Sequence, residues 1–340
     1  MWGNRMSERQ VQKSFLLALK IGLGSSIAIC IAQFLHLDNS VAAGSVTLLT
    51  LMTTKWGTVR LSVYRLLTFV FAVFCAFMIY QWMGSTWAAY GVFVFLMVAV
   101  CDLMGWTAAI SVNALIGAHF LETRDFSFHF IWNEFQLVLI GVCLAFILNM
   151  LYDYRGQKKH LIEKQREVEG KLQMILGELA AYLSNKDMQR NVWKDIEDLE
   201  NNLKEYIQEA HDYQDNTFQS HPGYYIDYFE MRLNQCDVIY NLHSEASRMR
   251  SMPAQARIIA EYILYMADYV VEINEPGPQM NRLQEIYADM KAEPLPVTRE
   301  EFESRALLYH ILMDLEDFLV FKSRFIDRLD EQKRRLYWNE

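Results

Sequence analysis

Charged side chains are distributed very unevenly along this chain of 340 residues. Only fourteen lie in residues 1–152, eight Lys or Arg and six Asp or Glu, and long apolar runs separate them. Residues 153–340 hold all the others and a net charge of −11. Apolar segments of about 20 residues are long enough to cross a bilayer as helices. We therefore predict an all-α protein, with a transmembrane domain at 1–153 and a cytosolic helical domain at 154–340.

The apolar runs of the first half predict a polytopic helical bundle of about six spans. They lie at about 14–35, 41–54, 62–83, 86–103, 105–121 and 133–152. The second and fifth runs are short and rich in small and hydroxyl residues, a composition that suits helices packed among other helices. A re-entrant hairpin formed by such a pair would reduce the number of spans to five.

The basic residues near the ends of these runs predict the orientation, because Lys and Arg in short loops mark the cytoplasmic side. If the N-terminus is inside, the inner segments carry almost all of them: Arg5, Arg9, Lys13, Lys55, Arg60, Arg155, Lys158 and Lys159. The outer loops carry only Arg124. We predict a multi-pass protein of the cytoplasmic membrane with both termini in the cytoplasm.

The second half has the apolar spacing of a helical bundle. One segment places apolar residues three and four apart, which aligns them along one side of a helix, and a second segment comes close to this spacing. The first is Val192, Ile196, Leu199, Leu203, Tyr206, Ala210 and Tyr213; the second is Tyr228, Met231, Gln235, Val238, Leu242, Ala246 and Met249. Further helices are predicted at about 157–184 and 298–335, the latter capped by Thr298, with breaks at 221–223, 252–253, 275–278 and 293–296. We expect five or six antiparallel helices.

Several classes of chemistry have no support in the sequence. It contains no glycine-rich phosphate loop, zinc-ligand spacing or nucleophile elbow, so we expect no cofactor, no metal and no enzyme activity. His160 resembles a sensor-kinase phosphoacceptor in position, but no ATP-binding boxes follow it. The acidic second half lacks the basic face that nucleic acid requires.

Two basic residues within the apolar runs are candidates for a substrate pathway. Ionisable groups inside a membrane are costly and usually face a cavity or a partner. Lys20 lies in the first predicted span and would attract an anion; extension of its side chain to the inner interface is an equal alternative. Arg65 lies in the third span, where anchoring at the cytoplasmic interface is the slightly favoured alternative.

An internal sequence similarity suggests four further pathway candidates. AAGSVT at 42–47 and AAISVN at 108–113 begin the second and fifth predicted spans, as in transporters built from inverted repeats. In such a repeat Ser45 would be equivalent to Ser111, and Thr47 would be equivalent to Asn113. Short matches of small residues are common in membrane helices, so coincidence is the favoured explanation. We nevertheless expect these polar side chains to face the bundle interior, and expect His119 and Glu134 to be solvated near the outer surface.

Two segments resemble the bacterial aromatic acid exporter family of the fusaric-acid-resistance superfamily, to which plant aluminium-activated malate transporters are distantly related. The first, TLLTLMTTKWGTVRLSVYRLLTFVFA, has a Thr-rich span, a cytoplasmic turn and Arg65 opening the next span. The second is DYFEMRLNQCDVIYNL at 227–242. The family pattern R-x-x-G-T-x-x-G is not matched after Arg65, where neither glycine is present. The resemblance implies a six-span exporter of aromatic acids in the bacterial inner membrane, with a helical C-terminal domain.

These features favour a transporter or channel-like exporter of organic anions, with aromatic carboxylates as the substrate class implied by the resemblance. Its partners would be the lipid bilayer, the small organic anion and further copies of the chain in a homo-oligomer, without nucleic acid. We expect the cytosolic bundle to gate the pore or hold protomers together. The alternative is a non-transporting scaffold or sensor whose cytosolic bundle binds a partner. An enzyme acting on lipids is a distant third.

Overall fold

A computed structural model describes residues 8–151, 155–184, 192–217, 223–249 and 251–338; only the backbone is described at 8–13 and 155. The chain divides into two compact units, residues 1–153 with 215–217 and residues 154–214 with 218–340. Arg5 and most of the predicted break at 221–223 lie outside the described residues, as do the side chains of Arg9, Lys13 and Arg155. All regular structure in the described ranges is helical, which confirms the predicted all-α class.

The first unit contains six α-helices and one short 3-10 helix within its described residues. They are α1 (Glu8–Phe34), α2 (Val41–Leu51), α3 (Lys55–Met83), α4 (Trp87–Leu103), η1 (Thr107–Ala109), α5 (Ile110–Thr123) and α6 (Phe128–Met150). By length and composition, three described segments are able to cross a membrane: Ser14–Phe34 of α1, all of α3 and all of α6. The shorter helices α2 and α4 are also apolar.

Hydroxyl caps place two helix starts earlier than the apolar runs predicted. The Thr54 side chain accepts a hydrogen bond from the Gly57 backbone N–H, so α3 begins at Lys55 instead of near residue 62. Ser127 similarly accepts from the Phe130 N–H and starts α6 before residue 133. Both helices therefore extend beyond the predicted spans. Helix α3 adds the segment 55–61, which carries Lys55 and Arg60, and α6 adds the largely apolar segment 128–132.

Helix α2 packs closely against α1 and α6, and seven of its eleven residues are buried. Small residues make this possible. A Cβ built on Gly141 of α6 would lie 2.6 Å from the Val46 side chain and 2.8 Å from the Ala43 carbonyl oxygen. Any larger residue would therefore separate the two helices. The expectation that the short second run packs among other helices is confirmed.

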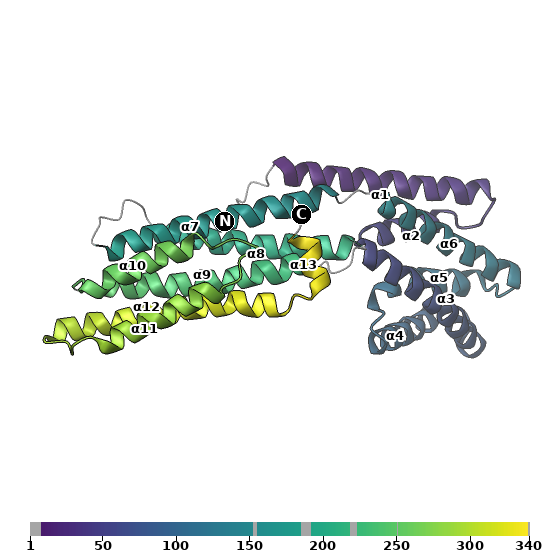
Figure 1. Ribbon diagram of the computed structural model, residues 1–340. Helices are drawn as coiled ribbons and strands as arrows, with labels where there is room; N and C mark the ends of the chain where they lie inside the picture. Colours follow the sequence, from purple (N-terminus) through teal and green to yellow (C-terminus); the bar gives the residue numbers. More distant parts are fainter. Residues whose placement is uncertain (1–7, 152–154, 185–191, 218–222, 250, 339–340) are drawn as a thin grey trace. The chain divides into compact units, whose positions relative to one another are not determined.

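The second unit contains seven α-helices within its described residues. Figure 1 labels each of these helices. They are α7 (Arg155–Leu183), α8 (Val192–Asn216), α9 (Tyr224–Arg248), α10 (Ala254–Ala267), α11 (Gly277–Ala292), α12 (Arg299–Asp327) and α13 (Glu331–Tyr337). Helix α9 packs on α12 and α7, and α10 packs on α7. All fourteen residues of the two predicted apolar seams are buried in this core, which confirms both seams.

The C-terminal helix starts where the sequence predicted but ends earlier. The Thr298 side chain accepts a hydrogen bond from the Glu301 N–H, so the predicted cap is confirmed. The expected single helix to about residue 335 is wrong, because α12 ends at Asp327. Asp330 then caps the separate helix α13 by accepting from the Lys333 N–H.

Candidate functional site

Arg65 of α3 lies inside the first unit with only 1% of its surface exposed. Its Nη1 donates to the Val46 carbonyl oxygen at 3.1 Å and to the Thr50 hydroxyl, both on α2. Its Nε is buried and has no partner. Within the described part of the chain, no carboxylate lies within 4.0 Å of this guanidinium. Arg65 is therefore a buried cation whose partners are neutral.

Asn113 of α5 lies beside Arg65 and is also fully buried. Its Nδ2 donates to the Arg65 carbonyl oxygen at 3.3 Å, to the Thr68 hydroxyl and to the Ala109 carbonyl oxygen at 3.2 Å. Its Oδ1 is buried without a partner. These bonds hold α5 against α3 at the level of Arg65.

A second polar group connects α1, α6 and the start of α3. The Lys20 ammonium donates to Asn149 Oδ1 at 2.5 Å. Asn149 Nδ2 in turn donates to the Thr53 carbonyl oxygen at 3.3 Å and to the Thr58 hydroxyl at 2.5 Å. Lys20 is half-buried, whereas Thr58 and Asn149 are buried. A cation is thus held at this end of the unit by an amide.

A third polar group lies at the other end of α6. The Glu134 side chain is fully buried; it contacts His119 Nδ1 at 3.0 Å and accepts from Asn39 Nδ2 at 3.0 Å. Asn133, next to it, exchanges hydrogen bonds with the backbone of Asp38. The expectation that Glu134 is solvated is wrong, because α5 and the segment before α2 close over it.

We call these three groups, together with Thr47, the polar column. Its members are Lys20, Asn149, Thr58, Arg65, Thr50, Asn113, Thr68, Thr47, His119, Glu134 and Asn39. On α6, Glu134, Gly141 and Asn149 are seven and eight residues apart and so share one face. Thr47 connects the middle of the column to that face by donating to the Gly141 carbonyl oxygen at 3.3 Å.

Only one residue of each predicted polar pair on α2 and α5 belongs to the column. Thr47 and Asn113 are buried in it. Ser45 is half-buried and donates to the Val41 carbonyl oxygen of its own helix, and Ser111 is exposed. Residues two apart on a helix point about 200° apart, so both members of a pair cannot face inward. The expected inward orientation of Ser111 is wrong, and Ser45 does not reach the column.

Two family models together match most of the chain. The model described as "Aromatic acid exporter family member 1" matches residues 13–152, and the one described as "Putative aromatic acid exporter C-terminal domain" matches residues 158–323. The chain belongs to the aromatic acid exporter family. The resemblance found in the sequence is confirmed, and the family membership supports a membrane protein with a transporter-like role.

Two similar proteins extend this comparison. "Uncharacterized protein YqjA" of Bacillus subtilis (strain 168) is 27% identical over 309 residues, covering 90% of this chain and 94% of the relative. A solved structure, "Crystal structure of putative membrane protein from Clostridium difficile 630", is 28% identical with a TM-score of 0.44. The match covers 48% of the present chain and 98% of the solved chain.

This chain departs from the family pattern next to Arg65. In R-x-x-G-T-x-x-G the two glycines fall at positions 68 and 72, where this chain has Thr68 and Ala72. Both residues are buried, so the helix remains closely packed without glycine. The Thr68 hydroxyl adds a hydrogen-bonding group beside Arg65 and accepts from Asn113.

Proposed function

We propose that the first unit exports organic anions and that Arg65 is the group that binds the anion on its way through. The observation that carries this proposal is a guanidinium buried to 1% exposure that has no carboxylate partner among the residues the structure describes. A buried charge in a membrane protein normally pairs with another charge or lines a substrate route. Because the neighbours of Arg65 are a carbonyl and a hydroxyl, an anionic substrate would supply the missing charge.

The other members of the polar column would bind the anion before and after it reaches Arg65. In this proposal Lys20 receives the anion at the cytoplasmic end, and Thr50, Thr68 and Asn113 offer hydrogen bonds around Arg65. A membrane potential that is negative inside assists anion exit by about 2.3 kcal/mol per charge per 100 mV. Export would then need no ATPase.

The proposed setting is the bacterial cytoplasmic membrane, with six helices forming the transmembrane bundle and both termini inside. The lengths of α2 and α5, eleven and fourteen residues, correspond to about 16 and 21 Å. Both are shorter than the roughly 30 Å hydrocarbon core, so we propose that they cross only part of it and rely on α3 and α6 for cover. The second unit would lie in the cytosol and gate a homo-oligomer.

Aromatic carboxylates are the proposed substrate class. The family description supports this class, and so does the position of Phe69, one helical turn beyond Arg65. Phe69 lines an apolar groove whose walls are largely aromatic: Phe69, Val70, Val73, Phe74, Phe77, Phe126 and Ile131. When the carboxylate of an aromatic acid is bound at Arg65, the ring of that acid would contact this aromatic surface.

Efflux from proteoliposomes tests the proposal. Radiolabelled benzoate and acetate would be loaded, and their release measured with and without an imposed potential. We expect potential-driven benzoate release, reduced about 10- to 100-fold in Arg65→Gln because a charged hydrogen-bonding group is lost. Arg60→Gln is the matched control, since Arg60 is exposed on the same helix, and it should export normally.

Absence of flux of either acid from inserted, folded protein would contradict the proposal. It would favour the alternative of a scaffold or sensor whose second unit binds a partner. Equal flux in Arg65→Gln and wild type would instead mean that the protein exports the acid but that Arg65 does not bind it.

A further inference from the structure

The first half of α12 carries a row of exposed apolar side chains, which we call the outer seam. Its members are Phe302, Ala306, Tyr309 and Met313, which are four, three and four residues apart. This spacing places them along one side of the helix, in the pattern with which one helix packs against another. A helix side that faces only water normally carries polar residues instead.

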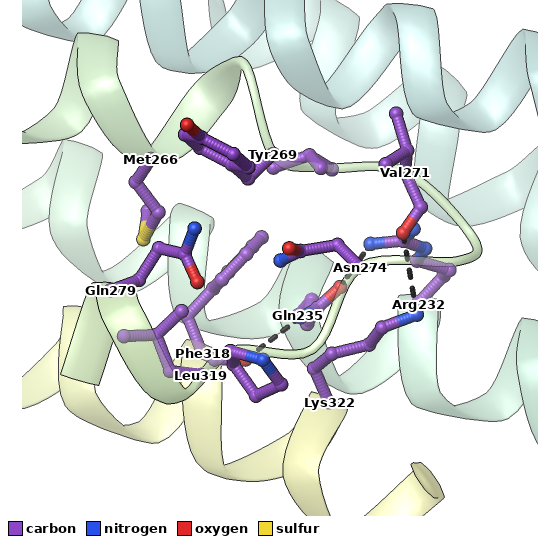
Figure 2. Close-up of a pocket in the computed structure, with 12 residues that line it drawn as sticks. Arg232, Gln235, Met266, Tyr269, Val271, Asn274, Gln279, Phe318, Leu319 and Lys322 are labelled. Atoms are coloured by element: carbon purple, nitrogen blue, oxygen red, sulfur yellow. Dashed lines mark hydrogen bonds between the residues drawn. The ribbon is translucent and has the colours of Figure 1, made fainter.

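The opposite side of α12 is occupied by its own unit. The residues that this helix contributes to the core include Leu308, Ile311, Leu312 and Leu315. Figure 2 shows further contacts on this inner side: Gln235 of α9 donates to the Phe318 carbonyl oxygen at 2.7 Å, and Lys322 donates to the Val271 carbonyl oxygen at 3.3 Å. Burial and the nearby Arg232 lower the pKa of Lys322 to about 7. The outer seam is therefore a second apolar side of α12, separate from the core.

The apolar surface continues from the outer seam into the connector between α11 and α12. Both sides of one groove are apolar there: α12 lines it with Phe302, Ala306 and Tyr309, and the connector lines it with Pro294, Leu295 and Pro296. Val297, the next residue of the connector, is 92% exposed. The large apolar side chains of this patch are Leu295, Val297, Phe302, Tyr309 and Met313, all of them exposed. A contiguous apolar patch on a surface that faces water marks an interaction site.

The patch is large enough for a specific interface. Each of its five large side chains leaves on the order of 100 Å² accessible. Two copies of the patch placed face to face would remove about 1,000 Å² from water, which is about the minimum for a specific protein–protein interface.

The two ends of the outer seam carry opposite charges. One further step of the same spacing leads to Arg299 before Phe302 and to Glu316 after Met313. Parallel pairing of two copies would place each of these charges against the same charge of the other copy. Antiparallel pairing would place Arg299 against Glu316, because the two are equally far from the centre of the seam. The seam is therefore complementary to a second, antiparallel copy of itself.

We propose that two copies of the chain associate through antiparallel α12 helices at this seam. Phe302 faces Met313 of the second copy, Ala306 faces Tyr309 of the second copy, and twofold symmetry repeats each contact. This arrangement rests on the cytosolic placement of the second unit proposed above, because in a membrane lipid would cover the patch. It does not depend on anion export.

Disulfide formation between copies tests the pairing. The full-length protein would carry Cys30→Ala and Cys143→Ala, which remove the exposed native thiols, together with Phe302→Cys and Met313→Cys. Oxidation should convert this variant into a covalent dimer. Phe302→Cys or Met313→Cys alone should give little dimer, because equivalent residues of antiparallel copies lie eleven positions, or about 16 Å, apart, beyond the reach of a disulfide.

Light scattering of the full-length protein in detergent measures the association itself. Phe302→Asp should weaken the dimer about 30-fold, because a central aromatic side chain is replaced by a charge in both copies. Leu264→Asp is the matched control on α10, where the side chain is similarly exposed, and it should leave the dimer unchanged. Arg299→Glu should weaken the dimer about tenfold, and addition of Glu316→Arg should restore it.

Unchanged association in Phe302→Asp, or a monomeric wild type, would overturn the proposal. A covalent dimer from Phe302→Cys alone, equal to that from the double variant, would overturn the antiparallel pairing. Protection of Phe302→Cys from a water-soluble maleimide by liposomes, without any dimer, would assign the patch to lipid and also overturn the proposal. Benzoate efflux is measured separately, so loss of the dimer and loss of export are distinguishable.

Discussion

Arg65 in the first unit and Arg232 in the second are equally buried, at 1% exposure, but their surroundings differ in charge. Arg232 contacts the Glu169 carboxylate and the Tyr228 hydroxyl. Arg65 contacts the Val46 carbonyl oxygen and the Thr50 hydroxyl, both neutral. Within the described ranges the charge of Arg65 has no carboxylate partner, whereas that of Arg232 is neutralised inside its own unit.

This difference separates a structural charge from one that is available to a ligand. A buried ion pair is costly to break, because removing one member leaves the other in a poor environment. A buried charge without a counterion is costly to keep, so its retention calls for a functional reason. Burial alone would have assigned both arginines the same role; the partner set distinguishes them.

The largest expected effect is on stability, at Arg232. Arg232→Met should destabilise the second unit by about 3–5 kcal/mol, because Glu169 loses its counterion. Hydrogen exchange of the α9 amides in the full-length protein would measure it. Arg65→Met is the matched change and should be nearly neutral for α3 exchange, since it removes a charge that had no ionic partner. An equal loss of stability in Arg232→Met and Arg65→Met would contradict the distinction between the two arginines.

A pH-dependent effect of about 2 kcal/mol is expected from Lys322. Its folded pKa of about 7 lies below the ordinary 10.5, so between these values the unfolded chain binds the proton and the folded chain does not. Stability of the second unit should therefore rise from pH 7 to pH 9. Unfolding of wild type and Lys322→Met would be compared at both values. A rise that persists unchanged in Lys322→Met would refute this assignment.

A smaller effect is expected at Asn113, which donates to the Arg65 backbone and to Thr68. Asn113→Ala should lower benzoate efflux about three- to tenfold, the equivalent of one net hydrogen bond. Ser111→Ala is the control, because Ser111 is exposed two residues earlier on the same helix. If both variants lost efflux equally, the inward face of α5 would have no special role.

The smallest effect is expected at Thr68, the position of a family glycine. Thr68→Ala should reduce efflux by only about twofold, because Asn113 retains its bonds to two carbonyl oxygens. Rates from the same proteoliposome assay would show it. A loss larger than that of Asn113→Ala would mean that Thr68 contacts substrate itself.

The sequence predicted what depends on periodicity and composition. The buried seams of α8 and α9 followed from apolar spacing, and the close packing of α2 followed from its small residues. It failed where a position depends on which side of a helix a residue occupies. Ser111 and Asn113 were treated alike, although two residues of separation place them on opposite sides.

The hydrogen-bonded members of the polar column were mostly missed. Glu134 and His119 are fifteen residues apart and meet only because α5 and α6 pack together. The sequence did contain one signal. Glu134 and Asn149 share a helix face with Gly141, so the spacing could have predicted a polar face on this apolar helix. The partners on α2 and α3 depend on tertiary packing and could not be read from spacing.

The most direct test of the central claim is equilibrium binding of benzoate to the purified full-length protein. Wild type, Arg65→Lys, Arg65→Gln and the control Arg60→Gln would be titrated together. An anion held by the uncompensated Arg65 predicts a loss of about 10- to 100-fold in Arg65→Gln, a smaller loss in Arg65→Lys and none in Arg60→Gln. Equal affinity in Arg65→Gln and wild type would contradict it.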